Sequence, residues 1–134
     1  MRAQVSIEYL LITGFSLLLL APILVLFSTQ SVHVDEQFQE SQAEQAARDI
    51  AASAQRVYYA GPPSKETLTV QIPRGVDEFV ISEQAIEFVF SDDPFRSVYV
   101  HTDVSLVPAS LNPAQGTARI EVQATQAGVV VQES

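Results

Sequence analysis

The chain has 134 residues, with 7 Lys and Arg against 16 Asp and Glu, which gives a formal net charge of −9. Because it has no cysteine and only two histidines, far apart in the sequence, it lacks a thiolate nucleophile, a disulfide and a local His motif for a metal or a catalytic triad. An acidic chain without a run of Lys or Arg also lacks the charge that binds nucleic-acid phosphates. We therefore expect one folded domain that is not an enzyme and uses no cofactor, metal or nucleic acid.

The first predicted element is an apolar segment near the N-terminus. The 19 residues from Tyr9 to Phe27 carry no charge, and after Glu8 none appears until Asp35. Thirteen of the 19 are Leu, Ile, Phe or Val. Together they favour insertion of a helix into a membrane by roughly 4 to 8 kcal/mol. The segment is long enough to span a bilayer, and no small-x-small cleavage site follows it as in a secretory signal peptide. Arg2 before the segment and Asp35 after it place the N-terminus in the cytoplasm and the rest of the chain outside.

An acidic residue, Glu8, stands at the start of this apolar segment. In one interpretation it is an interfacial residue in the first turn of a helix, where the helix dipole favours it by up to about 1 kcal/mol. In the other it enters an apolar environment, where a carboxylate is costly and needs a positive partner. The residues before it favour the second interpretation.

Residues Ala3 to Leu10 read A-Q-V-S-I-E-Y-L and lead directly into the apolar segment. In this order of residues the chain resembles the archaeal type IV pilin-like proteins with a class III signal peptide. In that family a very short basic leader ends in a small residue, Gln follows the cut, and Ser and Glu are the third and fifth residues of the mature chain. Carried onto this sequence, residues 1–3 form the leader, Ala3 and Gln4 flank the cut, and Ser6 and Glu8 take the two mature positions. This leader has a single Arg, and Ala stands where the family pattern has Gly.

The resemblance implies an assembly mechanism. A membrane-embedded prepilin peptidase would cut between Ala3 and Gln4 and leave the apolar helix attached. The new α-amino group on Gln4 is a cation at neutral pH, and it could pair with Glu8 of the same or the preceding subunit. Without that pair Glu8 would be an uncompensated charge in a bundle of helices. A cytoplasmic ATPase and a polytopic membrane platform would then assemble copies of the chain into an extracellular filament.

Three further residues of the apolar segment bear on helix packing. Gly14 and Ser16 are small enough to let neighbouring helices approach closely. Pro22 has no N–H to donate to the carbonyl of Leu18. The resemblance allows the helix to melt locally near Pro22 in an assembled filament, but membrane helices in general also tolerate proline, and both interpretations remain open.

Residues 30–61 are predicted to continue the helix, now with one apolar face. We call this face the apolar stripe; its residues recur at spacings of three and four and are Ala43, Ala46, Ala47, Ile50, Ala51, Ala54, Val57 and Tyr58. Charged residues lie on the other faces, among them the i,i+4 pair Glu44 and Arg48. Gly61-Pro62-Pro63 ends the helix. The stripe predicts packing against a sheet of the same domain, with a soluble coiled coil as the weaker alternative.

Residues 64–134 carry strand patterns throughout. Alternation of apolar and polar residues, or short apolar runs, predict strands near 68–72, 79–81, 86–90, 98–100, 104–107, 120–124 and 129–131. Turns are predicted at 73–75, 82–84, 92–94, 111–113 and 127–128. An Asp-Asp-Pro turn explains residues 92–94 better than a calcium site does. Short strands at this spacing predict a small antiparallel sandwich or barrel that gains a layer from the apolar stripe.

The predicted fold is therefore α+β: a hydrophobic helix over residues 4–29, its amphipathic continuation over 30–61 and a β-rich head over 64–134. We expect a pilin of an extracellular filament that serves adhesion, with other copies of itself as partners and the membrane as its site before assembly. The alternatives are a monomeric membrane-anchored binding module and an anchored secreted enzyme. A simple anchor needs neither a cleavage site nor Glu8, so the N-terminal residues favour the pilin.

Overall fold

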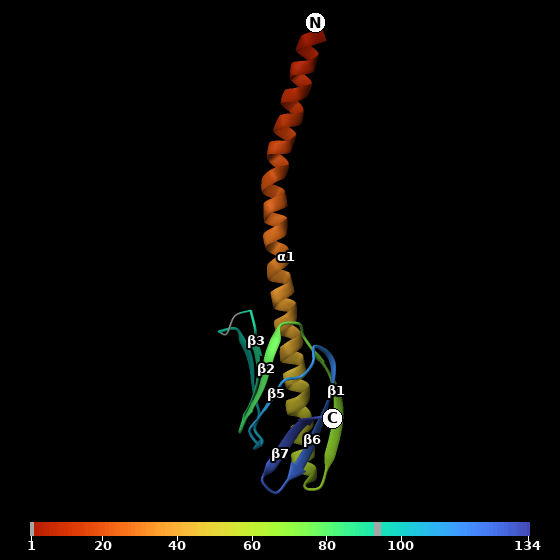
Figure 1. The fold of residues 1–134 in the computed structure, drawn as a ribbon, viewed down its shortest axis with the longest axis vertical. Coiled ribbons are helices and arrows are strands. Elements are labelled where there is room, and N and C mark those ends of the chain that lie inside the picture. Colours follow the sequence, from red (N-terminus) through yellow and green to blue (C-terminus); the bar gives the residue numbers. More distant parts are fainter. Residues whose placement is uncertain (1, 93–94) are drawn as a thin grey trace. The chain divides into compact units, whose positions relative to one another are not determined.

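The α+β fold class is confirmed by a computed structural model, which describes residues 2–92 and 95–134 (Figure 1). Helix α1 spans Arg2–Ala60. The seven strands that follow are β1 (Lys65–Ile72), β2 (Val76–Ser82), β3 (Ala85–Phe90), β4 (Ser97–His101), β5 (Ala109–Leu111), β6 (Gly116–Thr125) and β7 (Gly128–Glu133). The chain divides into two compact units, one up to Gln37 and one from Phe38 to Ser134. We call the second unit the head.

The predicted end of α1 is confirmed. The helix stops at Ala60, and Gly61 follows with a φ of 77°, in the left-handed region that glycine adopts without steric cost. The Gly61 N–H donates to the carbonyl of Val57 at 3.1 Å, which satisfies one of the carbonyls that every helix leaves open at its C-terminus. The chain then enters β1 directly.

The head holds two antiparallel sheets. One has the strand order β1-β6-β7 and the other β4-β3-β2-β5. β2 and β3 form a hairpin in which Phe79 pairs with Phe88, and β6 and β7 form a second in which Val122 pairs with Val131. Strands β1 and β6 pair along the whole of β1, from Lys65 with Gln123 to Ile72 with Gly116. Six of the seven predicted strands are therefore confirmed.

The strand predicted at residues 104–107 is wrong. Val104 and Leu106 are 1% and 2% exposed, so the apolar run reports burial and not regular pairing. The segment crosses between the sheets: the Leu106 N–H donates to Glu83 in the β2–β3 turn, and the Val107 N–H donates to Val129 in β7. Because these bonds go to two different sheets, no ladder forms there. The short strand β5, just after this segment, was not predicted.

The C-terminal part of α1 shares one core with both sheets. Ala43, Ala47, Ile50 and Ala54 are fully buried, in a cluster that also contains inward-facing residues of β1, β2, β3, β6 and β7. The packing of the apolar stripe on its own sheets is thereby confirmed, except at its end. Tyr58 is 45% exposed. Val57 is the last residue of α1 that is buried in the core, and the side chain of Tyr58, the next residue, points away from the core.

The turns are mostly as predicted. The structure has turns at 74–75, 83–84 and 126–127 and a loop after Leu111. The predicted turn at 92–94 falls largely on residues 93–94, outside the described residues.

Candidate functional site

The N-terminal residues singled out by the sequence lie on α1. Ala3, Gln4, Ser6 and Glu8 are all helical and exposed. Gln4 and Glu8 are four residues apart, so they share one helix face about 6 Å apart along the axis. The Glu8 carboxylate has no ion-pair partner among the side chains that the structure describes.

The apolar segment that follows is exposed along its whole length. Every residue from Tyr9 to Phe27 is solvent-exposed, with the large apolar side chains between 50% and 73% accessible. This part of α1 is long and apolar enough to cross a membrane. Its apolar surface is therefore not used to build the core of this chain, and burying it requires lipid or other helices.

Polar groups inside the apolar segment are satisfied by the helix itself. The Thr13 hydroxyl donates to the carbonyl of Tyr9 and the Ser16 hydroxyl to that of Ile12, both at 2.8 Å. Such bonds remove the cost of placing a hydroxyl in lipid or in a helix bundle.

Two other residues of the segment were linked to helix packing. At Gly14 nothing lies within 4 Å of the position that a Cβ would take. α1 runs through Pro22 as helix in the isolated chain. Gly14 and Ser16 thus present a small, internally satisfied surface, and their role in packing between subunits stays a prediction.

The head carries a cluster around Arg96 that the sequence did not reveal. The Arg96 guanidinium, in a side chain only 14% exposed, donates to Glu40 at 2.9 Å, Asp92 at 2.8 Å and Gln39 at 3.1 Å. It also lies 4.3 Å from the ring centre of Phe90, a cation–π distance. This cluster ties the start of the head's part of α1 to the end of β3. Its partners are up to 57 residues apart in sequence, so no local pattern could have shown it.

A second ion pair lies at the other end of the helix. Arg56 donates to both carboxylate oxygens of Glu66, at 3.1 and 2.7 Å. The Arg56 guanidinium lowers the pKa of Glu66, with a smaller contribution in the same direction from the Ser53 hydroxyl. Ser53 is fully buried, and its hydroxyl makes no hydrogen bond to a described residue. The predicted Glu44–Arg48 ion pair is confirmed on the exposed helix face.

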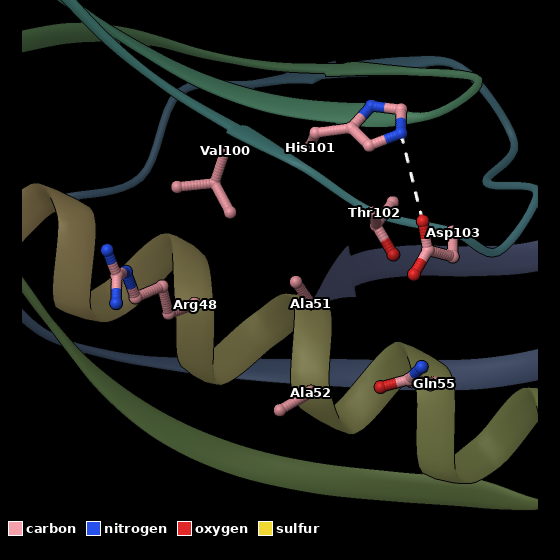
Figure 2. A pocket seen from close by; sticks show the side chains of 8 residues that line it. All are labelled: Arg48, Ala51, Ala52, Gln55, Val100, His101, Thr102 and Asp103. Atoms are coloured by element: carbon pink, nitrogen blue, oxygen red, sulfur yellow. Dashed lines mark ion pairs between the residues drawn. The ribbon is translucent and has the colours of Figure 1, made fainter.

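A shallow cleft of about 250 Å³ lies between α1 and the end of β4 (Figure 2). Arg48, Ala51, Ala52 and Gln55 line it from the helix, Val100 and His101 from β4, and Thr102 and Asp103 from the segment after β4. Figure 2 shows the Val100 side chain directed toward α1 and the His101 ring on the opposite side of β4, where it pairs with Asp103 at 3.9 Å. Within the described ranges no three His, Asp or Glu side chains lie together as a metal site requires.

A scan against protein-family models and searches of curated proteins and of solved structures give no match to this chain.

Proposed function

We propose that this chain is a pilin, the structural subunit of an extracellular filament of the archaeal type IV pilus-like kind. The observation that carries the proposal is the exposure of the apolar segment Tyr9–Phe27 directly behind the motif Ala3-Gln4-Val5-Ser6-Ile7-Glu8. The head completes its own core without that segment. A chain built in this way has one part that folds alone and one that needs the membrane or other copies of itself.

The motif supplies the chemistry for changing from one environment to the other. In the proposed mechanism a prepilin peptidase cuts between Ala3 and Gln4, and the new amino group of Gln4 compensates Glu8 when the helix leaves lipid. Because Gln4 and Glu8 share a helix face, the pair can form within one subunit or between adjacent subunits. Helix packing in the filament then buries the apolar segment and leaves the heads outside, where we propose that they serve adhesion.

The first test is the N-terminus of the native protein, read by intact mass or N-terminal sequencing. The expected mature chain begins at Gln4 and retains the apolar helix. A chain that starts at Met1 and stays in the membrane as a monomer would contradict the pilin and favour the membrane-anchored binding module.

The second test separates assembly from insertion. Glu8→Ala is expected to leave membrane insertion intact, because insertion depends on the large apolar residues and removing an acid makes it easier. Filament yield is expected to fall strongly, since deleting one partner of a buried ion pair costs about 3 to 5 kcal/mol per subunit. Glu8→Asp keeps the charge and should assemble in part.

Asp35→Ala is the matched control, because it removes an exposed acid from the same helix outside the motif. Its filament yield by electron microscopy should equal that of the wild type, with all variants compared by membrane fractionation. Wild-type filaments from Glu8→Ala would show that Glu8 is only an interfacial residue at the helix start.

A further inference from the structure

The head has one sheet edge that is neither paired nor protected. β4 lies at the end of its sheet, and in the described part of the chain no strand pairs with its outer side. The strand reads Ser-Val-Tyr-Val-His, without a Lys, Asp, Glu or Pro that would discourage a further strand. Tyr99 at its centre is 62% exposed.

The other three edge strands are short, charged or partly covered. The edge of β7 is occupied by the crossing segment, where the Val107 N–H donates to Val129 at 2.8 Å. β5 has only three residues, which is too short to template a partner strand. β1 begins with two charged residues, Lys65 and Glu66, each held in an ion pair. The contrast makes β4 the edge at which another strand can add.

The hydrogen-bond register shows which groups β4 offers. The Phe90 N–H donates to Arg96 and the Thr102 N–H to Gln84, so even-numbered residues of β4 bond to β3. In an antiparallel ladder the alternate residues direct their N–H and C=O groups to the other side. The free edge is therefore formed by the backbone of Ser97, Tyr99 and His101.

These groups are self-complementary. If a second copy of β4 lies antiparallel with Tyr99 opposite Tyr99, then Ser97 lies opposite His101 in both directions. The backbone groups of Ser97, Tyr99 and His101 in each copy then all have a hydrogen-bonding partner in the other copy. No like charges face each other in this register. The half-buried Val98 and Val100 become cross-strand neighbours on the helix-facing side.

A cleft lies between the helix and the end of this strand. The cleft has a volume of about 250 Å³, and α1 lines it with the small side chains of Ala51 and Ala52 and the longer ones of Arg48 and Gln55 (Figure 2). The cleft is on the helix-facing side of the sheet, next to Val100, which in this register lies opposite Val98 of the second copy.

We infer that β4 is an interaction surface for a second copy of this chain, which pairs with it as an antiparallel strand centred on Tyr99. The contact is isologous, so it joins copies two at a time and does not propagate a filament. It links two membrane-anchored chains or two filaments. It is independent of the proposed pilin function, because it uses no residue of the N-terminal motif.

Disulfide trapping tests the register directly, because the chain has no cysteine of its own. The full-length chain, in membranes of the expressing cells, carries one introduced cysteine and is oxidised briefly before non-reducing electrophoresis. Residues opposite each other in a bonded antiparallel pair have Cα atoms about 5.5 Å apart, within disulfide reach. Tyr99→Cys alone is expected to give a dimer.

The matched control is Thr69→Cys, an equally outward-facing and exposed position at the centre of the β1 edge. Its disulfide dimer should form at least about tenfold more slowly than that of Tyr99→Cys. Two Thr69→Cys chains meet only by chance collision, whereas docked copies hold their cysteines at a high effective concentration.

Mixed copies establish the direction of pairing. Ser97→Cys with His101→Cys should cross-link, whereas either variant alone should not, since Ser97 and its own counterpart would be about 13 Å apart along the strands. High salt should raise the yield by screening the repulsion between two copies of charge −9.

Three results would overturn the inference. One is a Tyr99→Cys dimer that forms no faster than that of Thr69→Cys. Another is cross-linking of Ser97→Cys to itself as readily as to His101→Cys. The third is trapping of Tyr99→Cys by a different protein, which would make β4 a docking strand for another partner. The mature N-terminus, measured on the same samples, reports separately on the pilin proposal.

Discussion

The two parts of α1 have the same secondary structure and opposite relations between apolarity and burial. Up to Gln37 the helix holds its most hydrophobic stretch, and residues such as Leu18 and Phe15 remain 68% and 63% exposed. From Phe38 onward it is rich in alanine and charge, yet Ala43, Ala47 and Ile50 are completely buried. An apolar stripe on one helix face thus predicts a core within the chain, whereas a helix that is apolar on all sides is expected to be buried by lipid or by other helices.

The largest expected difference between the two parts comes from matched phenylalanines. Phe88 is fully buried and stacks on Phe79 with ring centres 4.6 Å apart, so Phe88→Ala should destabilise the head by about 3 to 5 kcal/mol. Phe15→Ala removes the same atoms from the exposed segment and should leave head unfolding unchanged. Urea unfolding of the full-length chain in detergent, followed by circular dichroism, measures both. Equal losses would show that the segment before Gln37 contributes to head stability.

Arginines provide a second pair. Arg96→Ala should cost the head about 2 kcal/mol, because it removes a nearly buried guanidinium that donates to Gln39, Glu40 and Asp92 and leaves the two carboxylates without this ion pair. Arg48→Ala should cost under about 0.5 kcal/mol, since that side chain is 66% exposed in its pair with Glu44. Arg96→Lys should fall between them, because an ammonium cannot reproduce the planar set of donors. The same unfolding measurement applies. Equal stabilities of Arg96→Ala and Arg48→Ala would contradict a stabilising role for the Arg96 cluster.

Two glycine substitutions test how closely the segment around residues 104–107, which crosses between the sheets, packs against β7. Gly128 has a φ of 132°, and a Cβ there would lie 2.8 Å from the Ser105 carbonyl oxygen, which already accepts the Val129 N–H. Gly128→Ala should therefore destabilise the head by about 2 kcal/mol. Gly116→Ala, at a φ of 102° with open space around it, should cost about half as much. If the two variants melted alike, backbone strain alone would explain both.

The smallest effect is a dependence on pH. Because the folded pKa of Glu66 is lowered by Arg56, the ion pair stabilises the head above the ordinary carboxyl pKa of 4.5. The contribution is lost as pH falls through the lowered folded value. Wild type should exceed Glu66→Gln slightly in stability at pH 7, and the gap should close in acid. Glu133→Gln, which removes an exposed acid without an ion pair in the described ranges, is the control and should match the wild type at pH 7.

Periodicity along the chain was enough to predict the elements that depend on local pattern. The uncharged run from Tyr9, the apolar stripe from Ala43 and the Gly-Pro-Pro stop define the helix, and alternation within 64–134 defines six strands. The motif from Ala3 to Glu8 is also a property of sequence alone, since its meaning lies in the order of residues. Its processing and assembly roles remain predictions.

The way in which these elements combine depends on contacts between distant parts of the sequence. The burial of Val104 and Leu106 was visible as an apolar run, but their bonds to two different sheets depend on where those sheets lie. The free edge of β4 depends on strand order, which no local pattern encodes. The cluster joins Arg96 to Glu40 and Gln39, which precede it in the sequence by 56 and 57 positions. The physical reason is the same in each case: side-chain periodicity reports which face is apolar, whereas long-range pairing is set by which surfaces fit together once the chain has collapsed.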